Sequence, residues 1–328
     1  MKVPLKQIPP EPCGSDPALA ALLREGWRSA VARGAVAYDP TAVRPVLAPP
    51  YMFLYLPGRE ARPRTPLQGF QGLQGPLGGL RRPHTPCPFD TQEFLDEREV
   101  IRLARDGRCY HIAINKYPVL PQHYLAVRPA GDPPETLPQK LHGPEEISDM
   151  FRLAVLFGPQ YRFFFNSNQG ADGSRSGSSV NHWHFQIFPT EWGVVAQEPR
   201  LTAAREGVES GEAAGWAAHH RAWRSRDPDA LARQVWAAVE PIDRRDSAYN
   251  LEAASRPDGS VVAFLFPRAP TEDLRLPGGT VLSGDFGGFE LSGSVVVPDR
   301  TIFDWVREHP AEAAEIVTRR IREGTAPV

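Results

Sequence analysis

The sequence predicts an α+β fold, in which an antiparallel sheet carries flanking helices. Short apolar segments come in pairs joined by turns, as in residues 108–114 and 123–128, and this spacing is typical of hairpins. Helical periodicity is confined to separate stretches, which favours segregated helices over strict strand–helix alternation. Proline is frequent, at 35 of 328 residues, and therefore indicates long ordered loops rather than extensive helix.

The first expected element is an amphipathic helix over residues 16–33. Asp16 supplies the N-cap and Pro17 occupies the first turn. One apolar stripe runs along this helix and consists of Leu19, Leu22, Leu23, Trp27, Ala30 and Val31. Residues 35–86 are rich in Pro, Gly, Arg and Gln, and we expect an arm laid across the protein, with a buried strand at 53–56. A disordered linker is the competing interpretation.

The elements after the arm fall into separate groups of strands and helices. We expect strands at 108–114, 123–128, 161–165, 182–188, 248–254, 260–266 and 292–297. We expect helices at 143–157, 199–239 and 309–322. Gly143 and Pro144 open the first of these helices, and an Ala- and Arg-rich composition indicates the second.

Composition excludes several classes of partner. A net charge of −2 gives no bulk attraction to nucleic acid polymers or anionic membranes. No apolar run is long enough to span a membrane, and the first residues lack the apolar centre of a secretion signal. The three cysteines, Cys13, Cys87 and Cys109, are odd in number and far apart, which argues against a disulfide framework. We therefore expect a cytoplasmic protein.

The most informative segment is residues 181–186, which contains two histidines and a glutamine at alternate positions. Strand alternation places His182, His184 and Gln186 on one face and the apolar residues between them on the other. Neutral imidazole is a good nucleophile, and the Gly- and Ser-rich loop before it could hold phosphate oxygens. The pattern therefore predicts attack on phosphorus. A His-x-His pair on a strand is also a zinc-ligand pattern, and such a pair is often only a surface feature, so the pair alone leaves all three interpretations open.

Residues 177–186 resemble the active-site strand of the histidine-triad superfamily. The similarity is to its transferase and phosphorylase branch, in which Gln replaces the third His of the hydrolases, and most of all to GDP-L-galactose (GDP-hexose) phosphorylases. Diadenosine tetraphosphate phosphorylases and galactose-1-phosphate uridylyltransferases are more distant, because they carry Pro where this chain has Asn181. Further similar segments follow in the expected order at 115–127, 249–251, 266–268 and 290–293.

The resemblance, which covers residues 70–306, implies two histidine-triad-like halves in one unit, of which only the first keeps the catalytic strand. We therefore expect an N-terminal helix and arm over residues 1–82 and a catalytic half over 83–200. A second half with a C-terminal helix would occupy residues 201–328.

The resemblance also implies roles for the residues of the motif. His184 is the expected nucleophile, and His182 orients it or contacts phosphate, with a structural zinc ligand as the alternative. Gln186 can donate a hydrogen bond but cannot shuttle a proton, which favours transfer over hydrolysis. Ser179 and Gly177 are expected to bind the α-phosphate. Further candidate contacts for ribose or phosphate are Asn115, Lys116, His123, Asn166, Asn181 and Arg268.

The implied activity is phosphorolysis of a nucleoside diphosphate hexose by inorganic phosphate, through a nucleotidyl-histidine intermediate and with no required cofactor. Alternatives are a dinucleoside polyphosphate phosphorylase, a hexose-1-phosphate uridylyltransferase and a nucleotide-binding regulatory protein. His84 and Cys87 are spaced like half of a metal site, although the zinc-binding relatives use Cys-x-x-Cys, so a structural zinc is a further alternative. The sequence leaves open the base, the sugar, the acceptor, and whether the arm completes the site of a neighbour in a homodimer.

Overall fold

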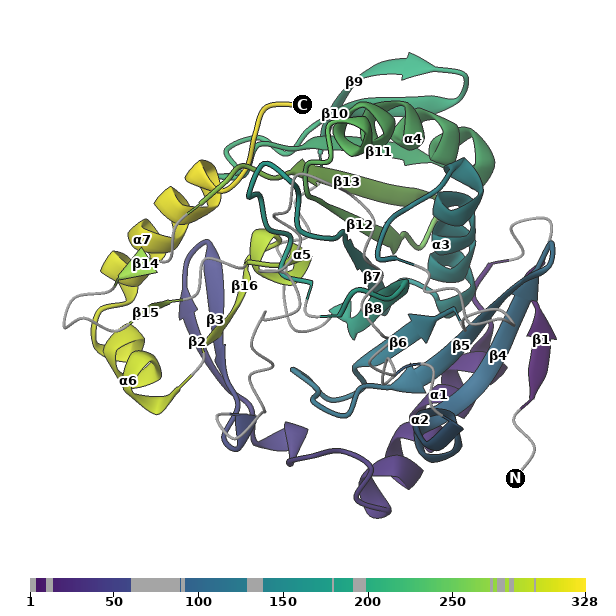
Figure 1. Ribbon diagram of the computed structural model, residues 1–328, viewed down its shortest axis with the longest axis horizontal. Coiled ribbons are helices and arrows are strands. Elements are labelled where there is room, and N and C mark those ends of the chain that lie inside the picture. Colours follow the sequence, from purple (N-terminus) through teal and green to yellow (C-terminus); the bar gives the residue numbers. More distant parts are fainter. Residues whose placement is uncertain are drawn as a thin grey trace, which may run out of the picture.

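The computed structural model describes residues 4–9, 14–59, 89, 92–128, 138–178, 180–190, 199–271, 274–275, 281–282, 286–297 and 299–328. Within these ranges the chain forms a large sheet with helices against it, which confirms the predicted α+β class (Figure 1). The eleven strands lie in the spatial order β1 (Leu5–Gln7), β4 (Glu99–Arg105), β5 (Arg108–Ile114), β6 (Tyr124–Val127), β8 (His184–Pro189), β7 (Tyr161–Asn166), β12 (Tyr249–Ser255), β13 (Val261–Pro267), β11 (Arg221–Ser225), β10 (Val208–Glu212) and β9 (Arg200–Arg205). All neighbours pair antiparallel except β1 and β4, which are parallel.

The sheet consists of two halves with the same internal order. In the first half, strands β4, β5 and β6, helix α3 (Pro144–Phe157) and strands β7 and β8 follow one another along the chain. Strands β9, β10 and β11, helix α4 (Pro228–Arg244) and strands β12 and β13 repeat this series. The spatial neighbours repeat as well, because β6 pairs with β8 as β11 pairs with β13, and the halves meet where β7 pairs with β12. This is the two-half fold expected from the sequence. The domain boundaries themselves stay predictions, and the one at 82–83 falls outside the described residues.

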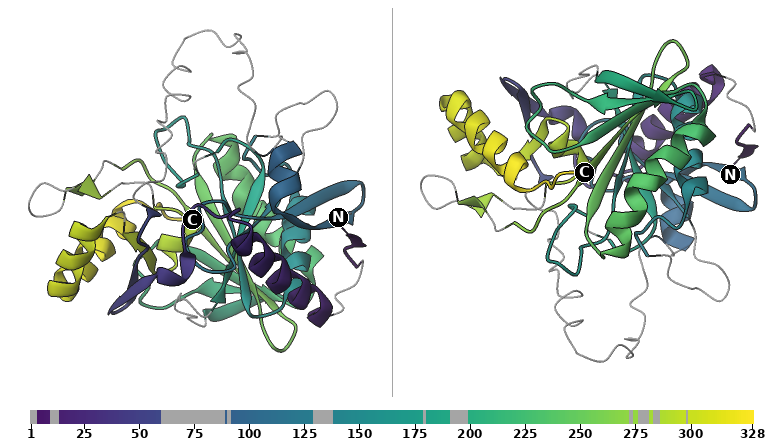
Figure 2. Two further views of the ribbon diagram at one scale, coloured as in Figure 1. Left: turned by 90° about the horizontal axis from the view of Figure 1, so that it is seen from below. Right: turned by 90° about the horizontal axis from the view of Figure 1, so that it is seen from above.

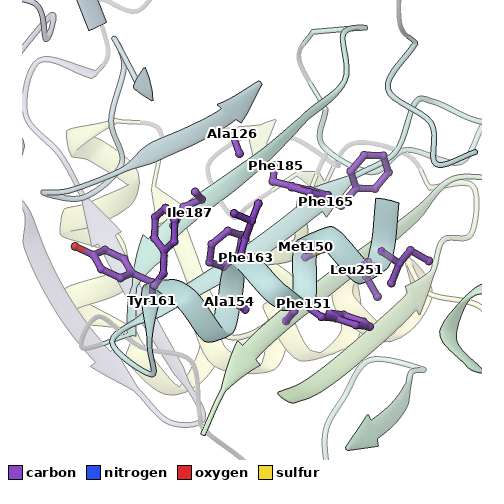
Figure 3. Packing of buried hydrophobic residues seen from close by; sticks show 14 of the residues in the cluster. Ala126, Met150, Phe151, Ala154, Tyr161, Phe163, Phe165, Phe185, Ile187 and Leu251 are labelled. Atoms are coloured by element: carbon purple, nitrogen blue, oxygen red, sulfur yellow. The ribbon is translucent and has the colours of Figure 1, made fainter. Parts of the chain in front are cut away.

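One face of the sheet is buried under helices α1 (Pro17–Ala32), α3 and α4, whose apolar residues join those of the strands in a single core. Figure 3 shows the centre of this core, where Met150 and Phe151 of α3 lie among Phe163, Phe165 and Leu251 of the sheet. All five side chains are fully buried. Burial of such large side chains stabilises the fold by about 1.5–3 kcal/mol each, so these contacts fix the strands that carry the site.

The opposite face carries a smaller second layer. Strand β3 (Tyr51–Tyr55) lies between β2 (Arg44–Ala48) and β16 (Ser294–Val297), and this layer together with α5 (Gly288–Leu291) packs on Phe164 and Phe188. Helices α6 (Arg300–Glu308) and α7 (Pro310–Glu323) lie at the opposite end of the molecule from β1 (Figures 1 and 2). The remaining elements are η1 (Pro40–Ala42), α2 (Gln92–Arg98), β14 (Leu274–Arg275) and β15 (Val281–Leu282). No helix in the described ranges has both the length and the apolar character needed to cross a membrane.

The prediction that residues 199–239 are mostly helical is wrong. Strands β9, β10 and β11 fill most of residues 200–225, and the helix of this region is α4. Glu206 and Gly207 join β9 to β10 with φ angles of 54° and 74°, which suits a tight hairpin turn. Pairing of β11 with β13 completes the second half, and this tertiary contact overrides the helical preference of the alanines.

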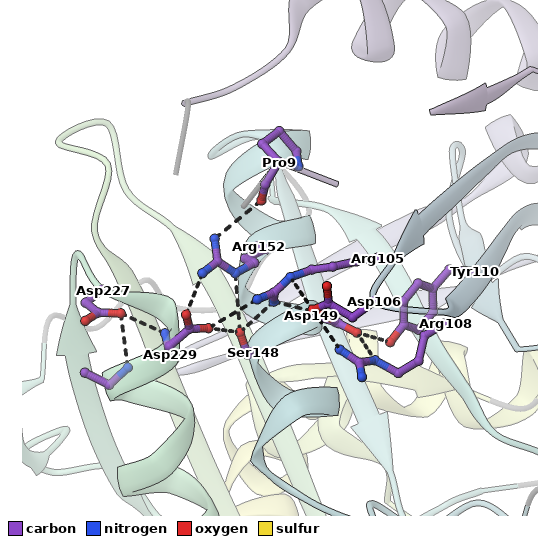
Figure 4. Close-up of polar contacts among 11 residues, drawn as sticks. Pro9, Arg105, Asp106, Arg108, Tyr110, Ser148, Asp149, Arg152, Asp227 and Asp229 are labelled. Atoms are coloured by element: carbon purple, nitrogen blue, oxygen red, sulfur yellow. Dashed lines mark hydrogen bonds and ion pairs between the residues drawn. The ribbon is translucent and has the colours of Figure 1, made fainter. Parts of the chain in front are cut away.

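A buried ion network ties α3 to both halves (Figure 4). Asp149 of α3 is fully buried and accepts hydrogen bonds from Arg105 Nη1 at 3.1 Å, Arg108 Nε at 2.6 Å and the Tyr110 hydroxyl. One turn later, Arg152 Nη2 donates to the carboxylate of Asp229, at the start of α4, with a distance of 2.7 Å. Because Asp149 holds two guanidinium groups, α3 cannot shift along the β4–β5 hairpin without leaving buried charges unpaired.

Candidate active site

The candidate site lies at the start of β8, where the His-x-His-x-Gln pattern is found. Alternation holds as expected, because Trp183 and Phe185 are fully buried in the core between the sheet and the helices. His184 is on the other face, where its ring meets Phe89 edge-on at a centroid distance of 5.3 Å. Strand β8 begins at His184, so His182 lies just before the strand and not within it.

The ring of His184 is held in one tautomer. Its Nδ1 lies 2.7 Å from the backbone carbonyl oxygen of His182. A carbonyl oxygen can only accept, so Nδ1 carries the proton and Nε2 keeps its lone pair. Within the described part of the chain, Nε2 accepts no hydrogen bond. The lone pair is therefore available for attack on an electrophile.

Burial keeps this imidazole uncharged. His184 is only 6 % exposed, and loss of solvation lowers its pKa to about 4, although the hydrogen bond to His182 acts in the opposite direction. Since only the neutral ring has a lone pair on Nε2, the residue is nucleophilic throughout the physiological pH range. The site thus supplies a neutral, oriented imidazole, which is what nucleophilic catalysis by histidine requires.

His182 is fixed at the end of β6. It is fully buried, and its Nε2 lies 2.6 Å from the carbonyl oxygen of Arg128, to which it donates. This bond holds the segment before β8 against the neighbouring strand. The carbonyl of His182 is thereby placed to accept from His184, so the residue orients the expected nucleophile through its backbone. A zinc-ligand role stays an alternative.

Gln139, which has no place in any sequence motif, contacts the backbone of His184 twice. Its Oε1 accepts from His184 N at 2.8 Å, and its Nε2 donates to His184 O at 2.8 Å. The residue is fully buried. Phe89 is the second residue that the sequence did not indicate, since it lies far from the motif along the chain. No local pattern identifies either of them.

Gln186 lies two residues further along β8 on the same face as His184. It pairs with Leu125 on β6 and with Phe164 on β7, and its side chain is partly exposed. Its amide makes no hydrogen bond to the residues that the structure describes. An amide beside a nucleophile can donate to a phosphate oxygen, so the geometry is compatible with the predicted role.

Asn166 and Arg268 belong to a buried polar network. Asn166 Oδ1 accepts from Asn250 Nδ2 at 2.7 Å and from Gly288 N at 3.0 Å. Arg268 donates from Nη1 to Asn250 Oδ1 at 3.0 Å and from Nε to the carbonyl of Gly324 at 2.9 Å. These contacts join the end of β7 to the second half and to α5. Contacts of Asn166 or Arg268 with ribose or phosphate stay predictions.

The turn between β5 and β6 contains three further candidates. Asn115 Oδ1 accepts from Tyr117 N at 2.9 Å, which is the bond of a turn-forming asparagine. His123 is 1 % exposed and lies over Phe188 at 4.1 Å, whereas Lys116 is exposed. Phe188 is four residues from His184, roughly 13 Å along a strand, so this turn lies at the far end of the same face.

The loop before β8 holds the last group of candidates. Gly177 has a φ of 79°, a left-handed conformation that favours glycine, and Asn181 Oδ1 accepts from Gln139 N at 3.0 Å. Ser179, His84 and Cys87 lie outside the described residues, so their predicted roles are untested. Among the residues that are described, no cluster of three His, Cys, Asp or Glu side chains could hold a metal ion.

The second half has no counterpart of the nucleophile. Pro189 and Pro267 end the equivalent strands β8 and β13 and pair with the tyrosines that begin β7 and β12. Counting back from these prolines, Val262 occupies the place of His184 and Phe264 that of Gln186. The two halves therefore share a fold but not a reactive group, as the resemblance implied.

Comparison with known proteins identifies the fold. No protein-family model matches the chain, and no curated protein sequence matches it. Crystal structures of yeast Ap4A phosphorylase Apa2 are similar, with a TM-score of 0.64 at 16 % identity over 95 % of this chain and 99 % of the yeast chain. Apa2 in complex with AMP has a TM-score of 0.62 at 18 % identity, over 95 % of this chain and 98 % of the yeast chain. Apa2 in complex with Ap4A has a TM-score of 0.61 at 17 % identity, over 95 % of this chain and 99 % of the yeast chain. The chain thus has the fold of a yeast enzyme over almost its whole length.

Proposed function

We propose that the chain is a nucleotidyltransferase in which His184 carries the nucleotide between donor and acceptor. The observation that supports this is the state of one ring, which is buried, neutral and bonded through Nδ1 so that Nε2 is available to react. A protein that only binds nucleotides has no need of such an oriented nucleophile. The fold of yeast Ap4A phosphorylase Apa2 agrees with chemistry at a nucleotide phosphate.

In the first step, Nε2 of His184 attacks the α-phosphorus of the donor. A nitrogen–phosphorus bond forms, and the bond to the leaving phosphate oxygen breaks, with its electron pair going to the departing sugar phosphate. The proton on Nδ1 stays on its hydrogen bond to the His182 carbonyl, which stabilises the positive charge that develops on the ring. The Gln186 amide donates to a phosphoryl oxygen. Attack by inorganic phosphate then releases the nucleotide and restores His184.

The preferred donor in this proposal is a nucleoside diphosphate hexose of the GDP-hexose type, split by phosphate into hexose 1-phosphate and nucleoside diphosphate. Asn181 supports this choice, because the resembling phosphorylases of dinucleotides and the uridylyltransferases have Pro before the first His. Its side chain accepts from Gln139 N, a bond that proline could not make. Phosphorolysis of a dinucleoside polyphosphate is the second candidate, favoured by the overall likeness to yeast Ap4A phosphorylase Apa2.

A substrate panel tests these proposals. GDP-, ADP- and UDP-hexoses and Ap4A are each incubated with inorganic phosphate or with hexose 1-phosphate, and products are separated by anion-exchange chromatography. Hexose 1-phosphate and nucleoside diphosphate from a GDP-hexose support the preferred donor, whereas ADP and ATP from Ap4A support the second candidate. Dependence on hexose 1-phosphate as acceptor would instead indicate a uridylyltransferase type of reaction, and dominant nucleoside monophosphate would indicate a hydrolase.

The covalent intermediate is tested without acceptor, by intact-mass spectrometry. Wild-type protein should gain one nucleoside monophosphate, and mild acid should remove it, since a phosphoramidate is labile to acid and stable to base. His184→Asn should never gain it. Turnover without an adduct would contradict the covalent route, and the absence of both across the panel would favour a nucleotide-binding protein.

A further inference from the structure

His184 pairs with Val127 of β6, but strand pairing leaves its backbone without a strand partner on the side of β7. The carbonyl of Trp183 accepts from Arg128 N at 3.4 Å, so the backbone of residue 183 points to β6. By alternation, the backbone of His184 points the other way, towards β7. The pairing of β7 with β8, however, ends at Phe164 and Gln186. The N–H and C=O of the expected nucleophile therefore face the position where that ladder has stopped.

The side chain of Gln139 occupies this position. Its amide accepts from His184 N and donates to His184 O, both at 2.8 Å, as a neighbouring strand residue would. The backbone of Gln139 continues the connection, because its N–H donates to Asn181 at 3.0 Å and its carbonyl accepts from Asn168 N at 2.8 Å. The residue thus joins His184, the segment before it and the loop after β7.

We propose that Gln139 is a positioning residue, which fixes the backbone of His184 and so sets the direction of Nε2 during nucleotidyl transfer. This inference rests on the proposed function of His184. The primary amide of Gln139 accepts from an N–H and donates to a carbonyl at the same time. An ionised carboxylate can accept but cannot donate, and a thioether cannot donate and accepts only weakly.

Loss of these bonds should displace His184 by a small distance but lower the rate constant of the reaction strongly. Displacement of a reacting group by about 1 Å can lower a rate constant by about 100-fold, even when the substrate is still bound. Substitution of Gln139 should therefore lower the rate constant for adduct formation and leave KM within about twofold. A purely structural role would lower the folded fraction and leave the rate constant of the folded molecules unchanged.

Two substitutions in the full chain test the inference. Gln139→Met keeps the length of the side chain and removes both bonds, and we expect a 10- to 100-fold loss of the single-turnover rate constant, about that of a mispositioned group. Gln139→Glu keeps the acceptor. When the introduced carboxyl is protonated it regains a donor, so the rate of this variant should rise towards wild type as the pH falls from 8 to 5. Gln160→Met is the matched control. Gln160 also donates to a backbone carbonyl, that of Phe157, with a distance of 2.7 Å, but it lies away from the site.

Adduct formation is followed by quenched-flow intact-mass spectrometry with a GDP-hexose and with Ap4A, without acceptor. A wild-type rate constant in Gln139→Met, or a loss no larger than that of Gln160→Met, overturns the positioning role. If Gln139→Met does not fold, the pH profile of Gln139→Glu decides, and a profile parallel to that of wild type overturns it. Failure of wild-type protein to form any adduct is a different result, which would contradict the proposed function itself.

Discussion

Phe89→Ala should raise the pKa of His184 and make nucleotidyl transfer sensitive to mild acid. The Phe89 ring lies edge-on to His184 at a centroid distance of 5.3 Å and to His182 at 5.7 Å, so it contacts both imidazoles. Burial is the main cause that lowers the pKa of His184. Removal of the ring admits water to the imidazole, so its pKa should rise towards the 6.5 of an exposed histidine.

The size of the effect follows from the fraction of neutral imidazole. With a pKa of about 4, about 0.9 of the His184 rings are neutral at pH 5. If the pKa rises to about 6, the neutral fraction at pH 5 falls to about 0.09, a tenfold loss of rate. At a fully exposed value it would fall to about 0.03, a loss of about 30-fold. At pH 8 the ring is neutral in all cases, so the difference should disappear.

Single-turnover formation of the nucleotidyl adduct is the appropriate assay, measured from pH 4.5 to 8 without acceptor. The pyrophosphate of a nucleoside diphosphate hexose stays ionised over this range, and leaving out inorganic phosphate removes its own titration. Leu95→Ala is the control, because Leu95 packs in the same apolar cluster as Phe89 without a ring contact to either histidine. It should leave the pH profile unchanged.

Two results would refute this reasoning. A Phe89→Ala profile that coincides with that of wild type would mean that the phenyl ring does not keep His184 neutral. A wild-type profile with its midpoint near 6.5 would mean that His184 is not buried when it reacts.

The other substitutions address the nucleophile, the acceptor and the fold. His184→Asn should lose at least about three orders of magnitude in the turnover rate. Its circular dichroism spectrum should match that of wild type, which checks that the variant is folded. Gln186→His should raise nucleoside monophosphate relative to nucleoside diphosphate in the presence of phosphate, and an unchanged ratio would contradict the role of the amide. Asp149→Leu should lower the free energy of unfolding in urea by about 3–5 kcal/mol, whereas Glu240→Gln, at an exposed pair, should change it by no more than about 0.5 kcal/mol. Burial opposes ionisation of His111, but its interactions with Cys109 and Glu99 prevail and raise its pKa to about 9. The free energy of unfolding of wild type should therefore fall, relative to that of His111→Gln, as the pH rises from 6.5 through 9.

Local signals in the sequence were sufficient for many elements. Asp16 caps α1 as expected, and accepts from Ala18 N at 2.9 Å and Leu19 N at 3.3 Å. The alternation around His184 was predicted because period-two patterning is a property of a few consecutive residues. The fold class followed from the hairpins and segregated helices, whereas the two halves were implied only by a resemblance that extends along the chain.

Two hairpin signals were present in the sequence but not recognised. Asp106-Gly107 joins β4 to β5, and Glu206-Gly207 joins β9 to β10, each with positive φ at both residues. Asp-Gly is a favoured pair in two-residue turns between antiparallel strands, and Glu206-Gly207 shares its glycine at the second position. They occupy equivalent places in the two halves, so they also mark the duplication. Recognition of the second turn would have prevented the helical prediction for residues 199–239.

Other features could not be predicted from the sequence, because they depend on contacts between distant segments. Gln139 is 45 residues from His184 along the chain and follows a proline, with no periodic pattern around it. Phe89 is further away still. The order of strands in the sheet also depends on contacts between distant segments, since β6 pairs with β8 and not with β7, the next strand along the chain. Side-chain amides and aromatic rings without a motif can be assigned to a site only after the fold is known.

The second half carries Val262 at the position equivalent to the proposed nucleophile, but it has a structural role. Its strand β12 holds the loop that leads to the site, because Tyr249 N donates to Ser167 Oγ at 2.8 Å and Tyr249 O accepts from Ser167 N at 3.1 Å. The turn before β12 adds a bond from Ala171 N to Asp246 O at 2.7 Å. A long loop fixed only at its ends would lose this order and would present the proposed phosphate-binding groups in many arrangements. The second half therefore supports the half that carries the proposed nucleophile, so substitutions in β12 should alter the proposed transfer without contact to the substrate.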